Sequence, residues 1–118
     1  MTSPARSPIT THVLDTALGQ PARGLAVKLE AQDSAGAWTE LAARTTDADG
    51  RVGDLVAPGS LQARTYRLSF DTGAYLRGAG RPVFYPRVEI TFAVTAPGEH
   101  HHVPLLLSPF GYSTYRGS

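Results

Sequence analysis

Four histidines are the residues of this chain best suited to acid–base chemistry near neutral pH. His12 lies in a β-branched stretch, and His100, His101 and His102 follow one another late in the chain. An imidazole titrates close to physiological pH, so it can take up or release a proton there. Neighbouring residues of a strand point to opposite faces, so His100 and His102 would share a side and His101 would point away. If the first and penultimate strands meet, His12 could join that side, either for proton transfer or as part of a zinc site.

Each of these residues also has an ordinary structural interpretation. Three consecutive histidines are commonly a solvated loop or an incidental weak metal binder. His12 also fits a core histidine whose ring is satisfied by a carbonyl group. Arg51 follows a DADG turn, where an arginine is usually exposed to solvent. The residues by themselves leave these alternatives open.

The elements that must position these side chains are strands. Twelve glycines and nine prolines supply frequent turn signals, including a predicted turn at residues 19–22. Residues 71–78 form the one plausible helix, with Asp71 or Thr72 as its N-cap and Gly78 closing it. Seven or eight short strands at this spacing predict an all-β sandwich, which we favour over a barrel. The predicted strands are residues 9–16, 25–32, 38–45, 65–70, 87–94, 101–108 and 112–118, and the short segment 51–56 would be the eighth.

The predicted strand at residues 101–108 is apolar on both faces. Val103, Leu105 and Leu107 share one parity, and a second set shares the other. That second set is His102, Pro104 and Leu106. If the first set fills the core, the second points outward although it is largely apolar. A second subunit covering this face would explain the pattern, so we predict an oligomer.

The composition excludes several classes of protein. The 118 residues carry 11 Lys and Arg against 10 Asp and Glu, a net charge of +1 that gives no basic surface for nucleic acid. The chain has no cysteine, which excludes disulfides and thiolate chemistry. No apolar run approaches the roughly 20 residues of a membrane span, and no signal peptide is visible. We expect one domain, residues 9–118, behind a flexible arm, residues 1–8, in the bacterial cytoplasm.

Four stretches of the chain together resemble the transthyretin-like 5-hydroxyisourate hydrolases. The resemblance runs from about residue 9 to residue 118, and the YRGS ending is its most specific element. Hormone-carrying transthyretins share the LLSP and YST framework but lack that ending, the two family histidines and the arginine. The four stretches are residues 11–15 (THVLD) with Gly19, Pro21 and Ala22, residues 46–51 (TDADGR), residues 81–86 (RPVFYP), and residues 100–118 (HHHVPLLLSPFGYSTYRGS).

The resemblance implies a fold, an activity and an assembly. The fold is a transthyretin-like (prealbumin-like) sandwich of two four-stranded sheets with one short helix. The activity is hydrolysis of 5-hydroxyisourate, the product of urate oxidation, to 2-oxo-4-hydroxy-4-carboxy-5-ureidoimidazoline on the route to allantoin. The implied assembly is a homotetramer, a dimer of dimers with active sites in the channel between them. No cofactor or metal is implied, nor any nucleic-acid or membrane partner.

The resemblance also implies roles for individual residues. Its matching positions give a catalytic set, a substrate-binding set that overlaps with it, and a supporting set. The family usually has an aromatic residue at the position of His101, on the face opposite the site. The catalytic set is His12, Arg51, His102 and Ser118; His12, Arg51 and Tyr115 bind substrate; His100, Arg116 and Gly117 support them.

The expected chemistry uses the two histidines as an acid–base pair and Arg51 as a clamp for the substrate and the developing oxyanion. The resemblance does not say which histidine is the base. Two other functions compete with this one. The first is a carrier of a hydrophobic hormone or small ligand, and the second is a structural sandwich module in which the histidines are incidental.

Overall fold

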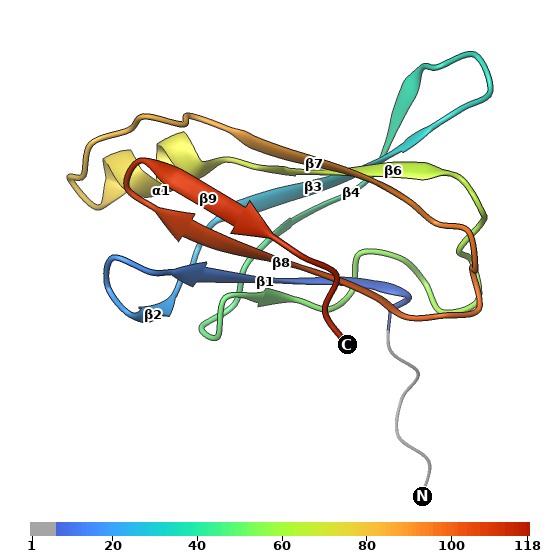
Figure 1. Cartoon of the computed structure of the whole chain (residues 1–118), viewed down its shortest axis with the longest axis horizontal. Coiled ribbons are helices and arrows are strands. Elements are labelled where there is room, and N and C mark those ends of the chain that lie inside the picture. The colour runs from blue at the N-terminus through green and yellow to red at the C-terminus, as the bar shows by residue number, and fades with distance from the viewer. Residues whose placement is uncertain (1–6) are drawn as a thin grey trace, which may run out of the picture.

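The computed structural model describes residues 7–118, which form nine strands and one short helix in two layers (Figure 1). The predicted arm, residues 1–8, lies mostly outside the described residues. Within the described range, no helix has the length and apolar character needed to cross a membrane. The elements are β1 (Ile9–Asp15), β2 (Gln20–Pro21), β3 (Ala26–Gln32), β4 (Trp38–Thr45), β5 (Arg51–Val52), β6 (Thr65–Phe70), α1 (Thr72–Gly78), β7 (Val88–Ala93), β8 (His101–Ser108) and β9 (Gly111–Thr114).

The strands form the two sheets that the sequence predicts, so the all-β sandwich is confirmed. One sheet has the order β4-β3-β6-β7. The other has the order β2-β1-β8-β9, and β5 also pairs with β1, which makes five strands in place of the expected four. The additional strand arises because β2 and β5 are only two residues long and pair with different parts of β1. The first and penultimate long strands, β1 and β8, run parallel along seven residue pairs.

The alternation of β1 and β8 places one face of this sheet in the core. Along β1 every second residue is buried, beginning with Ile9, and the residues between are half-buried. Along β8, Val103, Leu105 and Leu107 are buried, as their parity predicts. The Thr11 hydroxyl, also buried, donates a hydrogen bond of 2.6 Å to the Val103 carbonyl and so avoids an unpaired polar group. The opposite parity faces out of the sandwich, where His102 and Leu106 are half-buried but Pro104 is buried.

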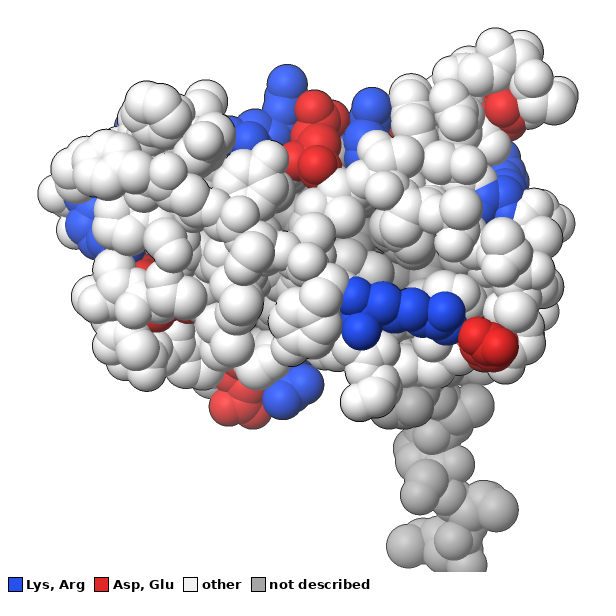
Figure 2. Space-filling view, viewed as in Figure 1, with Lys and Arg blue, Asp and Glu red and all other residues white. Residues whose placement is uncertain are grey.

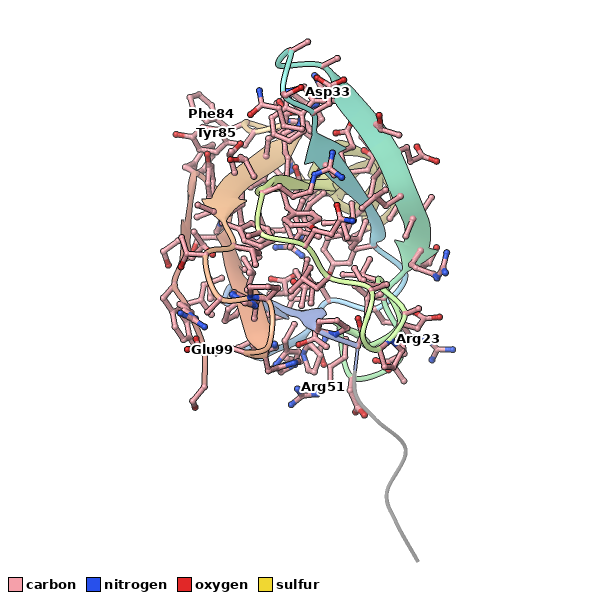
Figure 3. All side chains as sticks on the ribbon, turned by 90° about the vertical axis from the view of Figure 1, so that its right-hand side faces the viewer. Arg23, Asp33, Arg51, Phe84, Tyr85 and Glu99 are labelled. Atoms are coloured by element: carbon pink, nitrogen blue, oxygen red, sulfur yellow. The ribbon has the colours of Figure 1, made fainter. Side chains whose placement is uncertain are left out.

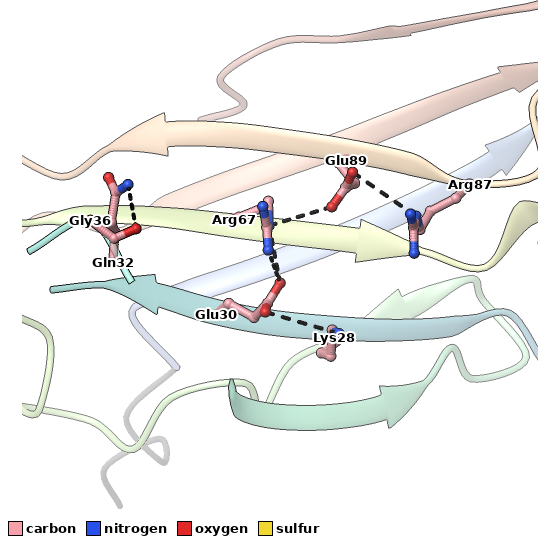
Figure 4. Close-up of polar contacts among 7 residues, drawn as sticks. All are labelled: Lys28, Glu30, Gln32, Gly36, Arg67, Arg87 and Glu89. Atoms are coloured by element: carbon pink, nitrogen blue, oxygen red, sulfur yellow. Dashed lines mark hydrogen bonds and ion pairs between the residues drawn. The ribbon is translucent and has the colours of Figure 1, made fainter. Parts of the chain in front are cut away.

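The outer face of the β4-β3-β6-β7 sheet carries a ladder of alternating charges (Figure 4). Arg67 on β6 contacts Glu30 on β3 at 2.9 Å and Glu89 on β7 at 3.5 Å. Lys28 and Arg87 extend the ladder at its two ends. Because each charge has an opposite neighbour, this face is compatible with water and needs no covering partner.

A buried carboxylate links the end of β1 to the helix and the segment behind it. Asp15 is fully buried and accepts hydrogen bonds from the Tyr75 hydroxyl at 2.7 Å and from the Arg81 guanidinium. Burial alone would raise the pKa of Asp15, but the bonds from Arg81 and Tyr75 outweigh it and lower that pKa. Burial and the neighbouring carboxylate also raise the pKa of Tyr75 to about 12. Helix α1 follows the predicted range, with Asp71 as N-cap accepting from the Ala74 amide.

Three local predictions differ from the structure. The segment 51–56 forms a strand only at Arg51–Val52. The predicted turn at residues 19–22 contains the short strand β2, which pairs with Leu14 and Asp15. The predicted last strand, residues 112–118, stops as β9 at Thr114. Its register with β8 resumes in a single bridge between His102 and Gly117. Pro104 lies opposite the interruption, and because proline has no N–H it cannot donate to the ladder there.

Candidate active site

Strands β1, β5 and β8 bring most of the predicted site residues to the outer face of one sheet. In the β1–β5 pair, His12 lies opposite Arg51, and in the β1–β8 pair, Thr10 lies opposite His102. A pocket of about 190 Å³ opens at this place. Its lining residues are Thr10, Thr11, Arg51, Val52, Gly53, His100, His102 and Ser118.

The turn before β5 fixes the position of Arg51. The Asp47 carboxylate accepts hydrogen bonds of 2.9 Å from the Asp49 and Arg51 amides. Gly50 has a φ of +75°, and a Cβ atom there would lie 2.4 Å from the Val13 carbonyl oxygen, so only glycine lets the turn approach β1 this closely. The exposed Arg51 side chain projects outward from the sheet (Figure 3). Its exposure agrees with the ordinary interpretation, and its place beside the histidines agrees with the functional one.

His12 is half-buried on β1 between Arg51 and Pro104. Its Nε2 atom is buried and has no hydrogen-bond partner among the described residues. A core histidine would have this nitrogen satisfied by a carbonyl group, so that alternative does not hold for Nε2. An unpaired imidazole nitrogen can bind a water molecule or a polar ligand atom.

His100 and His102 point to the same side, as the alternation predicts. Their rings are 6.4 Å apart and within 13° of parallel. The Thr10 hydroxyl contacts both rings, at 3.0 Å from His100 Nε2 and 2.8 Å from His102 Nδ1. Burial lowers the pKa of His102, and the charges of His100, Arg51 and His12 lower it further. The lowered pKa favours the neutral ring of His102, which is the form that can accept a proton.

The C-terminal tail packs directly against His102. The Gly117 amide donates a 2.8 Å hydrogen bond to the His102 carbonyl. A Cβ atom at Gly117 would lie 2.6 Å from His102 Cδ2, so the tail can take this path only with glycine. Arg116 contacts Glu99 at 2.9 Å and the His100 carbonyl at 3.4 Å. These contacts hold Ser118 at the edge of the pocket.

Two of the singled-out residues lie elsewhere. Tyr115 is 57% exposed and lines a separate hollow between β7 and the β8–β9 pair. His101 lies in that hollow, is 5% exposed and has no hydrogen-bond partner for Nδ1 in the described part of the chain. The single chain therefore does not bring Tyr115 to the pocket that holds Arg51 and His102.

Sequence reasoning missed two residues that shape this site. Thr10 shares the parity of His12 on β1, and this parity could have placed it beside the histidines. Asp47 could have been found as the first residue of an Asx turn that leads to Arg51. The zinc site considered for His12, His100 and His102 does not form, because no three His, Asp or Glu side chains of residues 7–118 lie close enough to hold a metal ion.

Comparison with known proteins identifies relatives along nearly the whole chain. The model of the HIUase/Transthyretin family matches residues 9–117. A protein from Mus musculus named 5-hydroxyisourate hydrolase is 48% identical, over 95% of this chain and 96% of its own length. The solved structure of Klebsiella pneumoniae 5-hydroxyisourate hydrolase has a TM-score of 0.82 at 37% identity, covering 93% of this chain and 97% of that one. Sea bream transthyretin in complex with thyroxine has a TM-score of 0.88 at 35% identity, covering 93% of this chain and 94% of that one.

Proposed function

The chain belongs to the HIUase/Transthyretin family, and from that premise we propose that it hydrolyses 5-hydroxyisourate. The reaction opens the six-membered ring at a cyclic amide bond and yields 2-oxo-4-hydroxy-4-carboxy-5-ureidoimidazoline in urate degradation. The observation that carries the proposal is that His12, Arg51 and His102 lie on one face, from three different strands. Arg51 and His102 line the pocket, and His12 lies opposite Arg51 in the sheet but does not line it. Two imidazoles and a guanidinium in one place are the groups that amide hydrolysis needs.

In the proposed mechanism, one imidazole of the His12 and His102 pair takes a proton from water. The resulting hydroxide adds to the amide carbonyl carbon and places negative charge on its oxygen. The Arg51 guanidinium stabilises that oxyanion and holds the substrate through its planar donor fork. The carbon–nitrogen bond then breaks, and an imidazolium returns a proton to the departing nitrogen. The lowered pKa of His102 supports its use as the base, because it favours the unprotonated ring.

The other residues of the predicted site bind the substrate or hold these three side chains in position. Ser118 lines the pocket and would bind substrate or the attacking water. Gly117 and Arg116 hold the tail against His102, and His100 shares the Thr10 hydroxyl with it. We keep Tyr115 as a substrate-binding residue only for the assembled protein, in which a neighbouring copy would complete the site.

The second candidate function is a carrier of small hydrophobic ligands. The similarity to sea bream transthyretin in complex with thyroxine supports it as a candidate, because the backbone resembles that complex as well as a hydrolase. The pocket itself favours the hydrolase. Its polar side chains are imidazoles, hydroxyls and a guanidinium, which suit an oxygen-rich heterocycle better than an apolar hormone.

We propose that the protein acts as a homotetramer in the bacterial cytoplasm. The outer parity of β8 supports the assembly, since His102 and Leu106 are half-buried on the face that a second dimer would cover, whereas Pro104 is already buried within the single chain. The channel between dimers would then enclose the pocket and exclude bulk water. Size-exclusion chromatography with light scattering tests the tetramer, and cell fractionation tests the location.

The direct test of the activity is a coupled assay. Urate oxidase generates fresh 5-hydroxyisourate, whose absorbance decay is followed with the wild-type protein, with a His102→Asn variant and without either. We expect fast decay with wild type and decay near the spontaneous rate with the variant. Decay at the spontaneous rate with tetrameric wild-type protein would reject the hydrolase, and thyroxine binding would then test the carrier.

A further inference from the structure

Thr10 joins two imidazoles through a single hydroxyl group. We propose that Thr10 is a positioning residue that couples the tautomers of His100 and His102 and thereby sets which nitrogen of His102 carries the proton. This inference deepens the proposed function, on which it rests for its catalytic consequence. Its structural part, the tautomer of His102, can be tested without any turnover.

The contacts that carry the inference are two short hydrogen bonds on one oxygen. Thr10 Oγ1 lies 2.8 Å from His102 Nδ1 and 3.0 Å from His100 Nε2. Both distances are in the normal hydrogen-bonding range, so both contacts are bonds and the hydroxyl is shared.

When the Thr10 hydroxyl donates its hydrogen to one of the two rings, two arrangements are possible. A hydroxyl has one hydrogen to donate, and a neutral imidazole has one protonated and one bare nitrogen. If Thr10 donates to His100 Nε2, then His102 Nδ1–H must donate to Thr10, which leaves His102 Nε2 bare. If Thr10 instead donates to His102 Nδ1, the proton of His102 is on Nε2 and His100 Nε2–H donates to Thr10. When the hydroxyl donates to one ring, the two rings therefore change tautomer together. A third arrangement, in which both rings donate to Thr10 Oγ1 and the hydroxyl hydrogen points elsewhere, also leaves His102 Nε2 bare.

The first arrangement prepares His102 to act as a base. Its bare Nε2 can take a proton from water, while Nδ1–H continues to donate to Thr10 in the imidazolium. The second arrangement presents Nε2–H as a donor. A hydroxyl that holds one arrangement therefore determines whether His102 accepts or donates, in the way that an orienting partner fixes the tautomer of other catalytic histidines.

Local structure holds the Thr10 hydroxyl in place. Thr10 lies opposite His102 in the parallel β1–β8 pair, so the two backbones fix the separation of these side chains. Thr10 is half-buried, and its branched Cβ restricts the rotation of the hydroxyl. The position of the donor is therefore set before substrate binds.

The experiment compares two replacements that separate the hydroxyl from the shape of the side chain. Thr10→Val keeps the shape and removes the hydroxyl, whereas Thr10→Ser keeps the hydroxyl and loses a methyl group. We expect kcat to fall about tenfold or more in Thr10→Val and to stay within about threefold of wild type in Thr10→Ser. We expect KM to change little in both, because the hydroxyl bonds to the base rather than to the substrate. If Thr10 only packs against its neighbours, kcat should fall more in Thr10→Ser, which loses a methyl group, than in Thr10→Val, which keeps the shape.

The second readout is the nitrogen NMR spectrum of His102 in the free protein at about pH 8, where the ring is neutral. We expect well-separated signals for Nδ1 and Nε2 in wild type and in Thr10→Ser, as one tautomer gives. In Thr10→Val the two signals should move toward each other, because both tautomers become populated. Thr16→Val is the matched control, since its hydroxyl contacts Leu107 and Ser108 away from the histidines.

The outcomes are distinct for the two proposals. An unchanged His102 spectrum in Thr10→Val, or an equal loss of kcat in Thr10→Ser, would overturn the role of Thr10. The proposed function can also fail by itself. In that case the wild-type protein has no hydrolase activity, but His102 still has a single tautomer, and Thr10→Val still populates both tautomers. This result would reject the proposed function and support the role of Thr10.

Discussion

At the scale of single residues, Arg51 supplies a permanent positive charge to a pocket whose other polar side chains are imidazoles and hydroxyls. We predict that Arg51→Lys lowers kcat/KM about 100-fold, because a point charge cannot replace two parallel donors to the oxyanion and the substrate. The coupled assay measures the loss. Arg44→Lys, at an exposed ion pair with Asp54, is the control and should behave like wild type. Wild-type turnover in Arg51→Lys would remove Arg51 from the mechanism.

Gly117 leads to a second prediction at this scale. In Gly117→Ala the new Cβ atom would lie 2.6 Å from His102 Cδ2, so the tail or the imidazole must move. We expect kcat to fall at least about tenfold with little change in Tm, since the clash is with a catalytic ring near the end of the chain. Gly111→Ala, where a Cβ atom meets nothing within 4 Å, is the matched control. Equal activity of the two variants would contradict a positioning role for the tail.

From the sequence, His12, Arg51 and His102 can be proposed as site residues, but the contacts around them cannot be predicted. Strand alternation is enough to place His100 and His102 on one side, because that depends only on the geometry of a single strand. The shared hydroxyl of Thr10 depends on the register between β1 and β8, which are separated by most of the chain. The close approach of Gly117 to His102 depends on a bridge after an interrupted strand. Neither contact can be predicted from the residues that adjoin it in the sequence.

At the scale of elements, the Asp15 carboxylate joins β1 to the segment that contains Tyr75 and Arg81. We predict that Asp15→Asn lowers the free energy of unfolding by about 3 kcal/mol, because it leaves a partly buried guanidinium without its charge partner. Urea denaturation measures the change. Asp54→Asn breaks an exposed pair and should cost less than about 1 kcal/mol. Equal costs in the two variants would show that burial does not strengthen the Asp15 pair.

The Asp15 carboxylate also makes the free energy of unfolding depend on pH in the acid range. Because the pKa of Asp15 is lower in the folded chain than its ordinary value of 3.8, the unfolded chain binds more protons at low pH. The contribution of Asp15 to stability is therefore complete above about pH 5 and is lost as the pH falls below 3.8 toward the folded pKa. The difference in stability between wild type and Asp15→Asn should shrink over that range.

The long strands can be predicted from the sequence, whereas the two-residue strands cannot. Strands β3, β6 and β7 alternate apolar residues with polar or small ones over six or seven residues, so a core face is visible in the sequence. Strands β2 and β5 have two residues each and exist because β1 offers them a partner. Pairing of this kind depends on tertiary structure, which local propensity does not encode.

At the scale of the whole molecule, the two sheets end on the same side in unpaired edge strands. Strands β7 and β9 are terminal in their sheets, and both line the hollow that contains His101. Near these edges, Phe84, Phe110 and Tyr112 are 60%, 67% and 42% exposed, and their rings belong to one cluster with Tyr85. The surface seen over β8 and β9 carries few charged side chains (Figure 2). Open edges and exposed aromatic rings together favour pairing with a second copy.

The last prediction tests this edge. A carboxylate in the aromatic cluster would have to be buried between two copies, so we expect Phe84→Asp to give a smaller species in light scattering. Phe84 projects from a different part of the molecule than Arg51 (Figure 3), so a direct effect of the substitution on the site is not expected. Hydrolase activity should nevertheless fall with the loss of assembly, because the pocket is then open to solvent. The circular dichroism spectrum should stay that of a folded β protein.

Leu41→Asp, on an exposed part of β4, should leave assembly and activity unchanged. A fully active monomer would show that one chain completes the site alone, and a Phe84→Asp tetramer would place the contact elsewhere.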